Sequence, residues 1–513
     1  MRFSRWPTWP TWIRLLFTVT LGAIAAFGLA PWNLWPLTLL VLLVLPTLLA
    51  NIPSARQAAL IGWALGVGWF GHGLIWIVEP FLVDVSRYGW MAPFALLFMA
   101  TGGGAFWALA FGVAYRVGKS NLTRILALLL TWSLIEFGRA YLFTGFPWAA
   151  LAQIWPGTDP SLLLAWIGPH GLALATLMAT LLPGWALSQS RGVRTILITT
   201  LPALGLIISS LSLGQTRPEM APLTTKAIRL IQPNAPQDQK WHPDFAWGFF
   251  DRQIAFTKAD SDGGPRPDLI VWPETAIPVL LDDAAATLET ISIAAAGSPV
   301  FLGIQRKQGG RYYNSSILLD GQGQIAERYD KHHLVPFGEY IPFGDLAAKF
   351  GLFGLAAQGR SGFSAGPGPR TLNIDGIGKA LPLICYEVVF PQDVGGTDDR
   401  PDYLLQITND AWFGTNSGPY QHLAQARMRA IEQGLPMIRV ANTGVSAMID
   451  PWGRITASIP LGQAGFVDAL LPMPRNPTYY ARTGDTPVFV LLLIASIGLI
   501  WLQSRGNGRI QDI

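Results

Sequence analysis

The sequence has little charge and almost no cysteine. Only 13% of its 513 residues are Asp, Glu, Lys or Arg, whereas an average soluble domain carries roughly 25%. Half of the residues are hydrophobic, and the mean hydropathy is +0.34. These values argue against a purely soluble protein. One Cys and six His exclude a disulfide framework and any metal cluster built from several cysteines.

Signals for several ligand classes are also missing. Nothing in the chain indicates a phosphate-binding loop, a dinucleotide site or nucleic-acid contacts. The pair His332-His333 is a possible metal site, but adjacent residues of an extended segment point in opposite directions. No cluster of Cys or carboxylates completes a site there. We therefore expect no metal, no cofactor and no nucleic-acid partner.

Long apolar runs are what the sequence does contain. A helix needs roughly 20 apolar residues to cross hydrocarbon about 30 Å thick. We expect about eight spans: a seven-span membrane domain over residues 1–215, and a C-terminal transmembrane helix over 484–505 that packs with it. The candidate spans are Trp12–Ala30, Leu34–Ala50, Ala58–Val78, Met91–Tyr115, Leu122–Phe137, Ser161–Leu187, Thr195–Leu213 and Thr486–Leu502.

The basic residues of the short loops predict the orientation, because Lys and Arg concentrate on the cytoplasmic side of a membrane. Here they fall at the N-terminus, after the even-numbered spans and after the last span: Arg2, Arg5, Arg56, Arg116, Lys119, Arg124, Arg191, Arg194, Arg505 and Arg509. A basic start also suits a cleaved signal peptide, but the long first run and the six spans after it favour an uncleaved helix. We expect both termini in the cytoplasm and the soluble domain on the far side.

The membrane domain does not resemble a transporter. Transporters keep ionisable residues at mid-membrane and are built from paired repeats. Here His72, Glu136, Arg139 and His170 are expected to sit singly, and no internal repeat is seen. The domain is either an anchor or a platform that admits a lipid laterally to a site at the outer surface. The loop Tyr141–Trp155, which is aromatic and has no Lys or Arg, is expected on that side.

Residues 222–471 have the pattern of an α/β domain. Most Asp and Glu fall here, and short apolar runs end at Pro, Gly, Asn or Asp, as buried strands do. A hairpin over 316–329 is predicted, with its turn at Gly321-Gln322-Gly323. Helices are predicted over Ala284–Ala296 and Gln421–Gln433. Strands and helices mixed in this way predict helices that cover buried sheets.

Three polar residues follow predicted strands. Glu274 comes after 269–273, Lys331 after the second hairpin strand, and Cys385 after 381–384. Together they offer a base, a positive charge for a developing oxyanion and a nucleophile. Singly, each has a plainer explanation: a loop carboxylate, a solvated Lys and a small buried hydrophobe. Outside the cytoplasm, however, a single Cys finds no disulfide partner within its own chain, which favours a reactive thiol.

The surrounding motifs resemble one family. W-P-E-T at Trp272–Thr275, D-K-H-H-L-V-P-F-G-E-Y at Asp330–Tyr340 and I-C-Y-E at Ile384–Glu387 resemble the Glu–Lys–Cys signature of the carbon–nitrogen hydrolase (nitrilase) superfamily. Several spans before such a domain and one after it resemble the apolipoprotein N-acyltransferases of bacterial inner membranes. The resemblance covers nearly the whole chain. It implies an α-β-β-α sandwich for the soluble domain and a periplasmic location for that sandwich.

The resemblance also implies residue roles. Cys385 would be the nucleophile, Glu274 its general base and Lys331 the cation beside the tetrahedral intermediate. The other matching positions are Glu339, Tyr386 and Glu387 in supporting roles, Trp241 and Asn314 near the substrate, and Phe146 and Trp148 on the path of the lipid. Simple packing would also explain the aromatic residues of this set.

The implied reaction is a two-step acyl transfer. Cys385 would take an acyl chain from a phospholipid, with phosphatidylethanolamine the expected donor, and form a thioester. The α-amine of an N-terminal S-diacylglyceryl-cysteine on an apolipoprotein would then accept the chain as an amide. One alternative is a membrane-tethered amidase or nitrilase that hydrolyses a C–N bond, which would not need eight spans. Another is a non-catalytic lipoprotein or lipid receptor, which would not need the intact Glu–Lys–Cys set.

Overall fold

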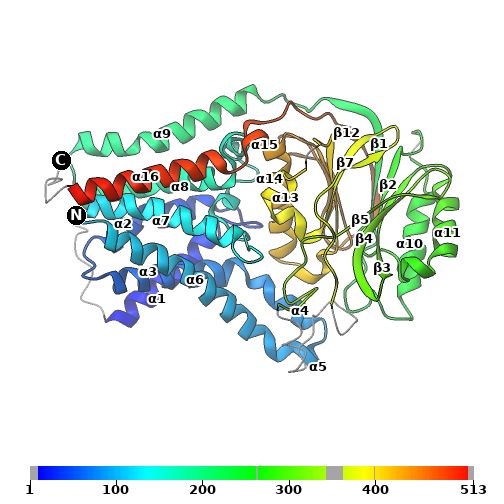
Figure 1. Ribbon diagram of the computed structural model, residues 1–513, viewed down its shortest axis with the longest axis horizontal. Coiled ribbons are helices and arrows are strands. Elements are labelled where there is room, and N and C mark those ends of the chain that lie inside the picture. Colours follow the sequence, from blue (N-terminus) through cyan, green and yellow to red (C-terminus); the bar gives the residue numbers. More distant parts are fainter. Residues whose placement is uncertain (1–9, 262–263, 343–361, 398, 506–513) are drawn as a thin grey trace. The chain divides into compact units, whose positions relative to one another are not determined.

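The computed structural model describes residues 10–261, 264–342, 362–397 and 399–505, and the chain divides into two compact units. The helical unit comprises the chain up to Val78, Tyr88–Arg217 and the chain from Tyr479 onward. The second unit comprises Glu79–Arg87 and Pro218–Thr478 and holds the described strands (Figure 1).

A helix lies at each of the eight predicted spans. The helices are α1 (Thr11–Ala26), α2 (Trp35–Leu49), α3 (Ala55–Gly73), α6 (Ala92–Val117), α7 (Asn121–Tyr141), α8 (Leu164–Ser188), α9 (Val193–Thr216) and α16 (Thr486–Arg505). Among the described residues, four helices are long and apolar enough to cross a membrane, or five if α3 and the bent segment after it form one span. Helices α1 and α2, with 16 and 15 residues, are shorter than the roughly 20 required. The count of eight spans therefore stays a prediction.

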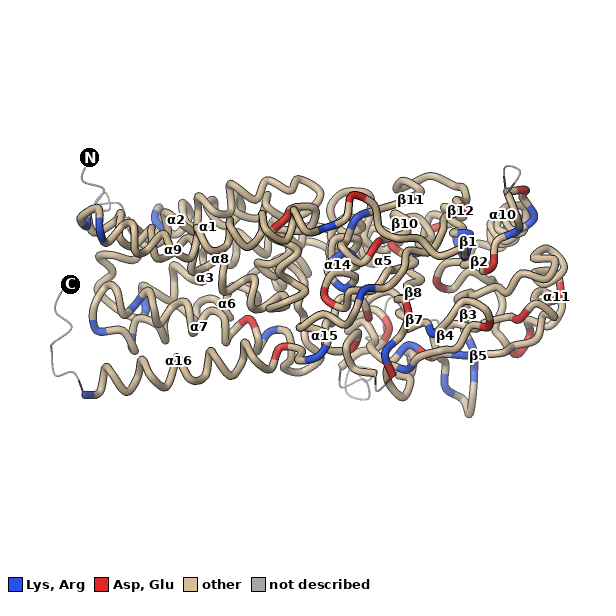
Figure 2. The backbone as a smooth tube through the Cα atoms, turned by 90° about the horizontal axis from the view of Figure 1, so that it is seen from above, with Lys and Arg blue, Asp and Glu red and all other residues tan. Residues whose placement is uncertain are grey.

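The helical unit packs through apolar and small residues. A Cβ on Gly66 of α3 would lie 2.7 Å from the Cα of Gly104 on α6, so these two helices can approach closely only without side chains there. Helix α16 packs on α7 through a cluster that contains Phe137, Val488 and Leu492. Figure 2 shows that Asp, Glu, Lys and Arg are sparse along these helices.

Glu136, Arg139 and His170 do not sit singly in the helical unit, so the expectation was wrong for these three residues. Glu136 and Arg139 form an ion pair of 2.6 Å on α7, because residues three apart share one face of a helix. Glu136 also accepts from the indole N–H of Trp107 at 3.0 Å. His170 Nε2 lies 3.9 Å from a carboxylate oxygen of Asp485. These pairs allow charged groups to be buried in an apolar bundle.

The loops after the even-numbered spans lie at one end of the helical unit. Lys119, between α6 and α7, donates to the carbonyl of Gln503 near the end of α16 at 2.6 Å. Asn121 donates to Gln189, just after α8, at 3.2 Å. A pocket at this end is lined by residues beside the α2–α3 and α6–α7 turns and by Gln189 after α8, among them Ala50 and Tyr115. Three basic residues of the orientation argument lie outside the described residues: Arg2, Arg5 and Arg509.

The second unit is a sandwich of two six-stranded sheets, which confirms the predicted α-β-β-α class. One sheet has the order β12-β1-β2-β3-β4-β5 and the other β11-β10-β9-β8-β7-β6. The strands are β1 (Leu223–Gln232), β2 (Leu269–Val271), β3 (Val300–Gln308), β4 (Arg311–Leu319), β5 (Ile325–Asp330), β6 (Leu372–Ile374), β7 (Gly378–Ile384), β8 (Tyr403–Thr408), β9 (Met437–Ala441), β10 (Ser446–Ile449), β11 (Ile455–Ile459) and β12 (Gly465–Pro472). Helices α10 (Ala246–Lys258) and α11 (Ala285–Ala295) cover the first sheet, and α14 (Gly418–Gln433) contacts β9 of the second (Figure 1).

Strand direction determines where the loops of the site begin. Strands β1, β2 and β3 are parallel, as are β7, β8 and β9, so the carboxyl ends within each set share one edge of the sheet. The predicted hairpin is confirmed: β4 and β5 are antiparallel, with Ser315 opposite Asp330. This register brings the N–H of Lys331 to 2.9 Å from the carbonyl of Asn314.

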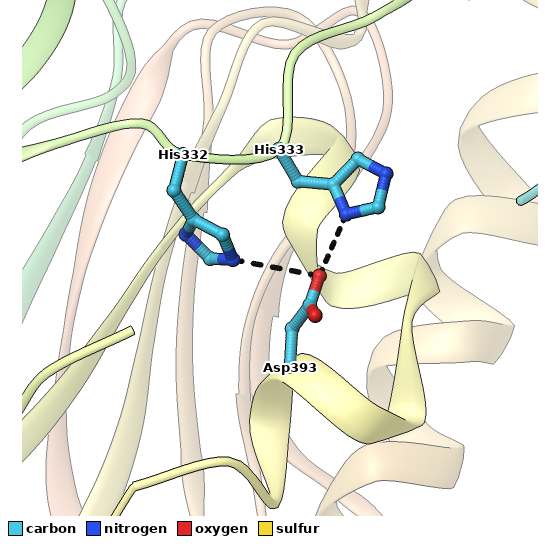
Figure 3. Close-up of side chains that lie close together, drawn as sticks. All are labelled: His332, His333 and Asp393. Carbon is cyan, nitrogen blue, oxygen red and sulfur yellow. Dashed lines mark hydrogen bonds and ion pairs between the residues drawn. The ribbon is translucent and has the colours of Figure 1, made fainter. Parts of the chain in front are cut away.

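The segment after the hairpin is irregular, and its two histidines converge on one carboxylate (Figure 3). Nδ1 of His333 lies 2.7 Å from Oδ2 of Asp393, and Nε2 of His332 lies 3.5 Å from the same oxygen. The expectation that the two rings point in opposite directions was wrong, because side chains alternate only where the backbone is extended.

Candidate active site

The backbone is unusual at two strand ends. Glu274 follows β2, and Thr275 after it has φ +46°. A Cβ on Gly303 would lie 2.6 Å from the Cα of Glu274, so β3 has no room for a side chain at position 303. Cys385 directly follows β7 with φ +51° and begins the short 3₁₀ helix η6 (Cys385–Val389). This left-handed conformation costs a residue with a Cβ about 1–2 kcal/mol, and such strain is typical of functional positions.

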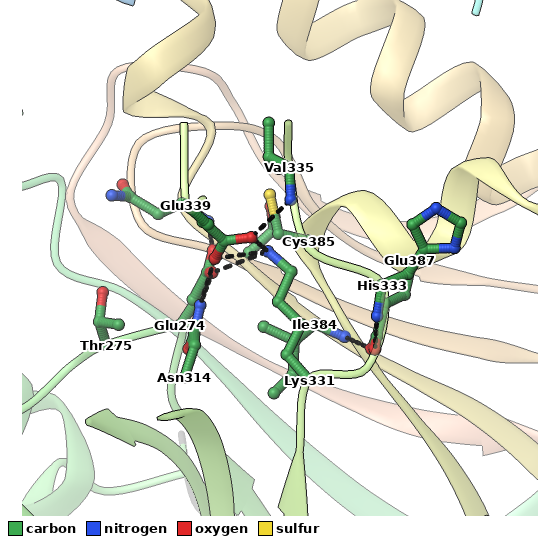
Figure 4. Close-up of polar contacts among 12 residues, drawn as sticks. Glu274, Thr275, Asn314, Lys331, His333, Val335, Glu339, Ile384, Cys385 and Glu387 are labelled. Atoms are coloured by element: carbon green, nitrogen blue, oxygen red, sulfur yellow. Dashed lines mark hydrogen bonds and ion pairs between the residues drawn. The ribbon is translucent and has the colours of Figure 1, made fainter. Parts of the chain in front are cut away.

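One buried cation joins two buried carboxylates (Figure 4). Lys331, which is 1% exposed, places Nζ 2.9 Å from Oε1 of Glu339 and 3.7 Å from Oε1 of Glu274. Nδ2 of Asn314 donates to both carboxylates, at 2.6 Å to Glu274 and 3.0 Å to Glu339. The backbone N–H of Asn409, at the end of β8, donates to the other oxygen of Glu274 at 2.8 Å. Residues from both sheets therefore fix the Glu274 carboxylate.

Burial and charge set the protonation of these groups. Burial raises the pKa of Glu274, although the Lys331 charge opposes the shift. Burial also raises the pKa of the Cys385 thiol; the Glu274 charge raises it further and Lys331 opposes it. Burial alone would lower the pKa of Lys331, but Glu339 and Glu274 outweigh it and raise that pKa. The resting site therefore holds a charged Lys331 and a protonated thiol, with Glu274 within electrostatic reach of both.

A buried polar network supports the Cys385 turn. The carbonyl oxygen of Cys385 accepts from Nε2 of Gln406 at 3.3 Å and lies 3.1 Å from Nε2 of His422. Nδ1 of His422 lies 2.8 Å from Oδ1 of Asp410, whose other oxygen is paired with Arg439. Burial lowers the pKa of His422. For Asp410, burial alone would raise the pKa, but Arg439 and His422 lower it.

Glu387 connects two segments of the site. Its Oε2 accepts from the backbone N–H of Ile384 at 2.7 Å. Its Oε1 accepts from the backbone N–H of His332 at 2.7 Å and from the hydroxyl of Tyr329 at 2.9 Å. The Glu387 side chain is fully buried. It thus holds the loop that carries the cation against the turn that carries the thiol.

Trp241 lines a pocket beside the Glu274 strand end. The lining of this pocket includes Phe249, Pro273 and Thr275. Lys240 also lines it, and its Nζ donates to the carbonyl of Glu274 at 3.0 Å and to Oγ1 of Thr275 at 2.8 Å. Burial lowers the pKa of Lys240 to about 8. The hydrogen bonds of Lys240 therefore connect the short segment that bears Trp241 to the backbone at Glu274 and Thr275.

The remaining predicted residues pack in their own units. Tyr386 is buried among the rings of His333 and Phe390. In the helical unit Trp148 is fully buried, with its ring 4.5 Å from that of Trp76. Phe146 is half-buried. The expected role of both residues on the path of the lipid stays a prediction.

The chain is similar to known proteins over nearly its whole length. Residues 21–182 match the family model described as the apolipoprotein N-acyltransferase N-terminal domain, and residues 246–475 match the carbon-nitrogen hydrolase model. An apolipoprotein N-acyltransferase of Rhodopseudomonas palustris is 35% identical over 520 residues, 96% of each chain. Another, of Bradyrhizobium diazoefficiens, is 38% identical over 508 residues, 94% of each chain. The chain belongs to the apolipoprotein N-acyltransferase family.

Members of this family are acyltransferases, and the family and the apolar helices together make this chain a bacterial membrane protein. A solved amidase of the nitrilase superfamily from Nesterenkonia AN1 aligns with 53% of this chain and 99% of its own, at 18% identity and a TM-score of 0.38.

Several residues of the site were missed in the sequence. Lys240, Gln406 and Arg439 gave no signal of their own, because each reaches the site through space from a different element. His422 lies on the helix predicted over Gln421–Gln433, but the helical pattern did not indicate that it is buried against the Cys385 turn. The pair Asn409-Asp410 directly follows β8, and that position at a strand end was the available clue.

Proposed function

We propose that this protein moves an acyl chain from a phospholipid to the α-amine of an N-terminal S-diacylglyceryl-cysteine on apolipoproteins, with Cys385 as the acyl carrier. Family membership supports the overall reaction. The observation that supports the mechanism is that the buried side chains of Cys385, Glu274 and Lys331 gather at the strand ends (Figure 4).

The first half-reaction forms a thioester. Because the pKa of the Cys385 thiol is raised, the thiol needs a base at the moment of attack, and Glu274 accepts its proton. The sulfur bonds to the ester carbonyl carbon of the phospholipid and gives a tetrahedral oxyanion. The C–O bond then breaks, and Glu274 returns the proton to the departing lysophospholipid oxygen.

Lys331 stabilises the oxyanion in this scheme. Its charge is held by Glu339 and Glu274, and it is almost fully buried, so little solvent reorganisation accompanies its interaction with the developing charge. Asn314 and the N–H of Asn409 keep the Glu274 carboxylate in one orientation. We assign Glu339, Asn314 and Glu387 to positioning, and Trp241 with its pocket to contact with substrate.

The second half-reaction uses the same groups in the opposite direction. The neutral α-amine of the lipoprotein attacks the thioester carbonyl, Glu274 takes the proton that the nitrogen loses, and the C–S bond breaks. The amide product leaves and the sulfur regains a proton. Splitting the transfer in this way predicts ping-pong kinetics.

We further propose phosphatidylethanolamine as the donor, the bacterial inner membrane as the location, and a periplasmic position for the catalytic domain. Both substrates carry acyl chains anchored in lipid, which supports a membrane-attached catalyst. The shared end of the basic loops supports cytoplasmic termini. These proposals retain a seven-span region over 1–215, a catalytic domain over 222–471 and a last transmembrane helix over 484–505.

The test reconstitutes the full chain in vesicles that contain a phospholipid with a labelled acyl chain and a diacylated lipopeptide with a free amino terminus. We expect labelled N-acyl lipopeptide from the wild type and none from Cys385→Ala. Phosphatidylethanolamine should support a faster rate than phosphatidylglycerol with the same chains. Release of free fatty acid without N-acyl product, or full activity of the Cys385→Ala variant, would overturn the proposal.

A further inference from the structure

The side chains of His332, His333 and Asp393 form a cluster that the acyl transfer does not use (Figure 3). Nε2 of His332, Nδ1 of His333 and one carboxylate oxygen of Asp393 all lie within 4.8 Å of one another. All three side chains are partly buried. Nε2 of His332 is shielded from solvent and has the 3.5 Å ion pair with Asp393 but no hydrogen bond among the described residues. A buried ring nitrogen without a hydrogen bond can still accept a further ligand.

We propose that His332, His333 and Asp393 bind a divalent transition-metal ion, with Zn²⁺ the best match. Two imidazole nitrogens and one carboxylate oxygen suit Zn²⁺. Ligand atoms about 2.0–2.1 Å from a tetrahedral ion lie roughly 3.3 Å apart. The corresponding separations from Oδ2 of Asp393 are 3.5 Å and 2.7 Å, and the three ligand atoms all lie within 4.8 Å of one another, so side-chain rearrangement on the order of 1 Å would seat an ion.

The surroundings of the two rings are also those of a metal site. Nδ1 of His332 lies 2.6 Å from Oε1 of Glu387, and a carboxylate on the far nitrogen orients a metal-binding imidazole and makes it a better ligand. The ring of His333 stacks on Phe390 with centroids 3.5 Å apart, which fixes its direction. Glu387 and Asp393 together supply two negative charges, which would balance a divalent ion.

Such an ion would link two segments of the acyl-transfer site. The histidines directly follow Lys331, whereas Asp393 lies on the helical turn α13 (Pro391–Val394) that follows η6 and Cys385. The metal ion would therefore cross-link the loop after Lys331 to the turn at Cys385. Glu387 already connects the same two segments with hydrogen bonds. The ion is structural in this proposal and takes no part in the acyl-transfer chemistry.

The test measures metal binding directly on the full-length protein, purified in detergent with an affinity tag that contains no histidine and stripped with a chelator. We expect one Zn²⁺ per chain in competition with a chromogenic chelator, and a visible d–d absorption band when Co²⁺ is added instead. His333→Gln and Asp393→Asn should each weaken binding at least about tenfold. Zn²⁺ should raise the melting temperature of the wild type and leave that of Asp393→Asn unchanged.

His242→Gln is the matched control, because His242 lies 3.6 Å from Asp244 in an exposed pair, and no described residue adds a third ligand there. It should keep the binding of the wild type. The proposal fails if the wild type takes up no more Zn²⁺ or Co²⁺ than Asp393→Asn, or if His242→Gln loses as much affinity as His333→Gln. None of these readouts depends on acyl transfer, so they test metal binding separately from the proposed function.

Discussion

The Nζ atom of Lys331 lies 3.7 Å from Oε1 of Glu274, and both side chains are buried. The same ammonium group is 2.9 Å from Glu339, so a single cation serves two carboxylates. Buried charges are tolerated when they are paired and hydrogen-bonded. The proposed base and the proposed oxyanion partner therefore interact electrostatically, and removing either group should change the pKa of the other.

Lys331→Met should reduce the rate of acyl transfer by about 10²–10³-fold, as expected for the loss of an oxyanion partner. The pKa of Glu274 should rise further, because the Lys331 charge now lowers it. Glu274 works as a base only when ionised, so the rise of activity with pH should move to higher pH. The measurement is the pH dependence of N-acylation in vesicles.

Lys379→Met is the matched control for that variant. Lys379 is half exposed and pairs with Asp399 at 3.1 Å on the surface, where such pairs contribute little. Its rate and its pH profile should equal those of the wild type. If the pH profile of Lys331→Met coincides with that of the wild type, the charges of Lys331 and Glu274 are not coupled.

Glu274→Gln should strongly reduce the rate of acyl transfer and yet lower the pKa of the thiol. Loss of a general base costs about 10²–10⁴ in rate. The Glu274 charge raises the pKa of Cys385, so its removal should lower that pKa and increase the thiolate fraction at a given pH. Because the chain has one Cys, the pH dependence of alkylation reports this thiol alone. A shift of the alkylation profile to higher pH would contradict the electrostatic account.

Glu387→Gln should destabilise the catalytic domain by about 3 kcal/mol. The carboxylate accepts from the backbone N–H groups of His332, His333 and Ile384 and from the hydroxyl of Tyr329. An amide places an N–H₂ against at least one of these donors. Chemical denaturation of the detergent-solubilised protein, followed by Trp fluorescence, measures the change.

The matched control for this loss is Glu327→Gln. Glu327 forms a partly exposed pair with Arg370 at 3.2 Å, and its removal should change the free energy of unfolding by less than about 1 kcal/mol. Equal effects of the two substitutions would mean that the buried acceptor adds no more stability than a surface carboxylate.

The orientation of the chain predicts a labelling pattern. In a Cys385→Ala background, which has no other Cys, Asp244→Cys should react with a membrane-impermeant maleimide in spheroplasts. Gly192→Cys, in the basic loop after α8, should react only after permeabilisation, and the structure leaves open space for its side chain. Labelling of Gly192→Cys in intact spheroplasts would reverse the proposed orientation.

The elements set by local pattern were predictable from the sequence. The hairpin of β4 and β5 and the parallel strands ending at Glu274 and Cys385 follow from apolar runs and turn residues. Contacts across the two sheets were not predictable, because the N–H of Asn409 reaches Glu274 from 135 positions away in the chain. The convergence of His332 with His333 was missed because the local backbone is irregular.

The most direct measurement is the mass of the Cys385 peptide after the wild-type protein has been incubated with phospholipid vesicles and no lipoprotein acceptor. The account predicts a gain of one acyl chain on Cys385 that neutral hydroxylamine removes and that a diacylated lipopeptide consumes. Transfer to the lipopeptide by a protein whose Cys385 never carries a chain, or an acyl chain on a different residue, would contradict it.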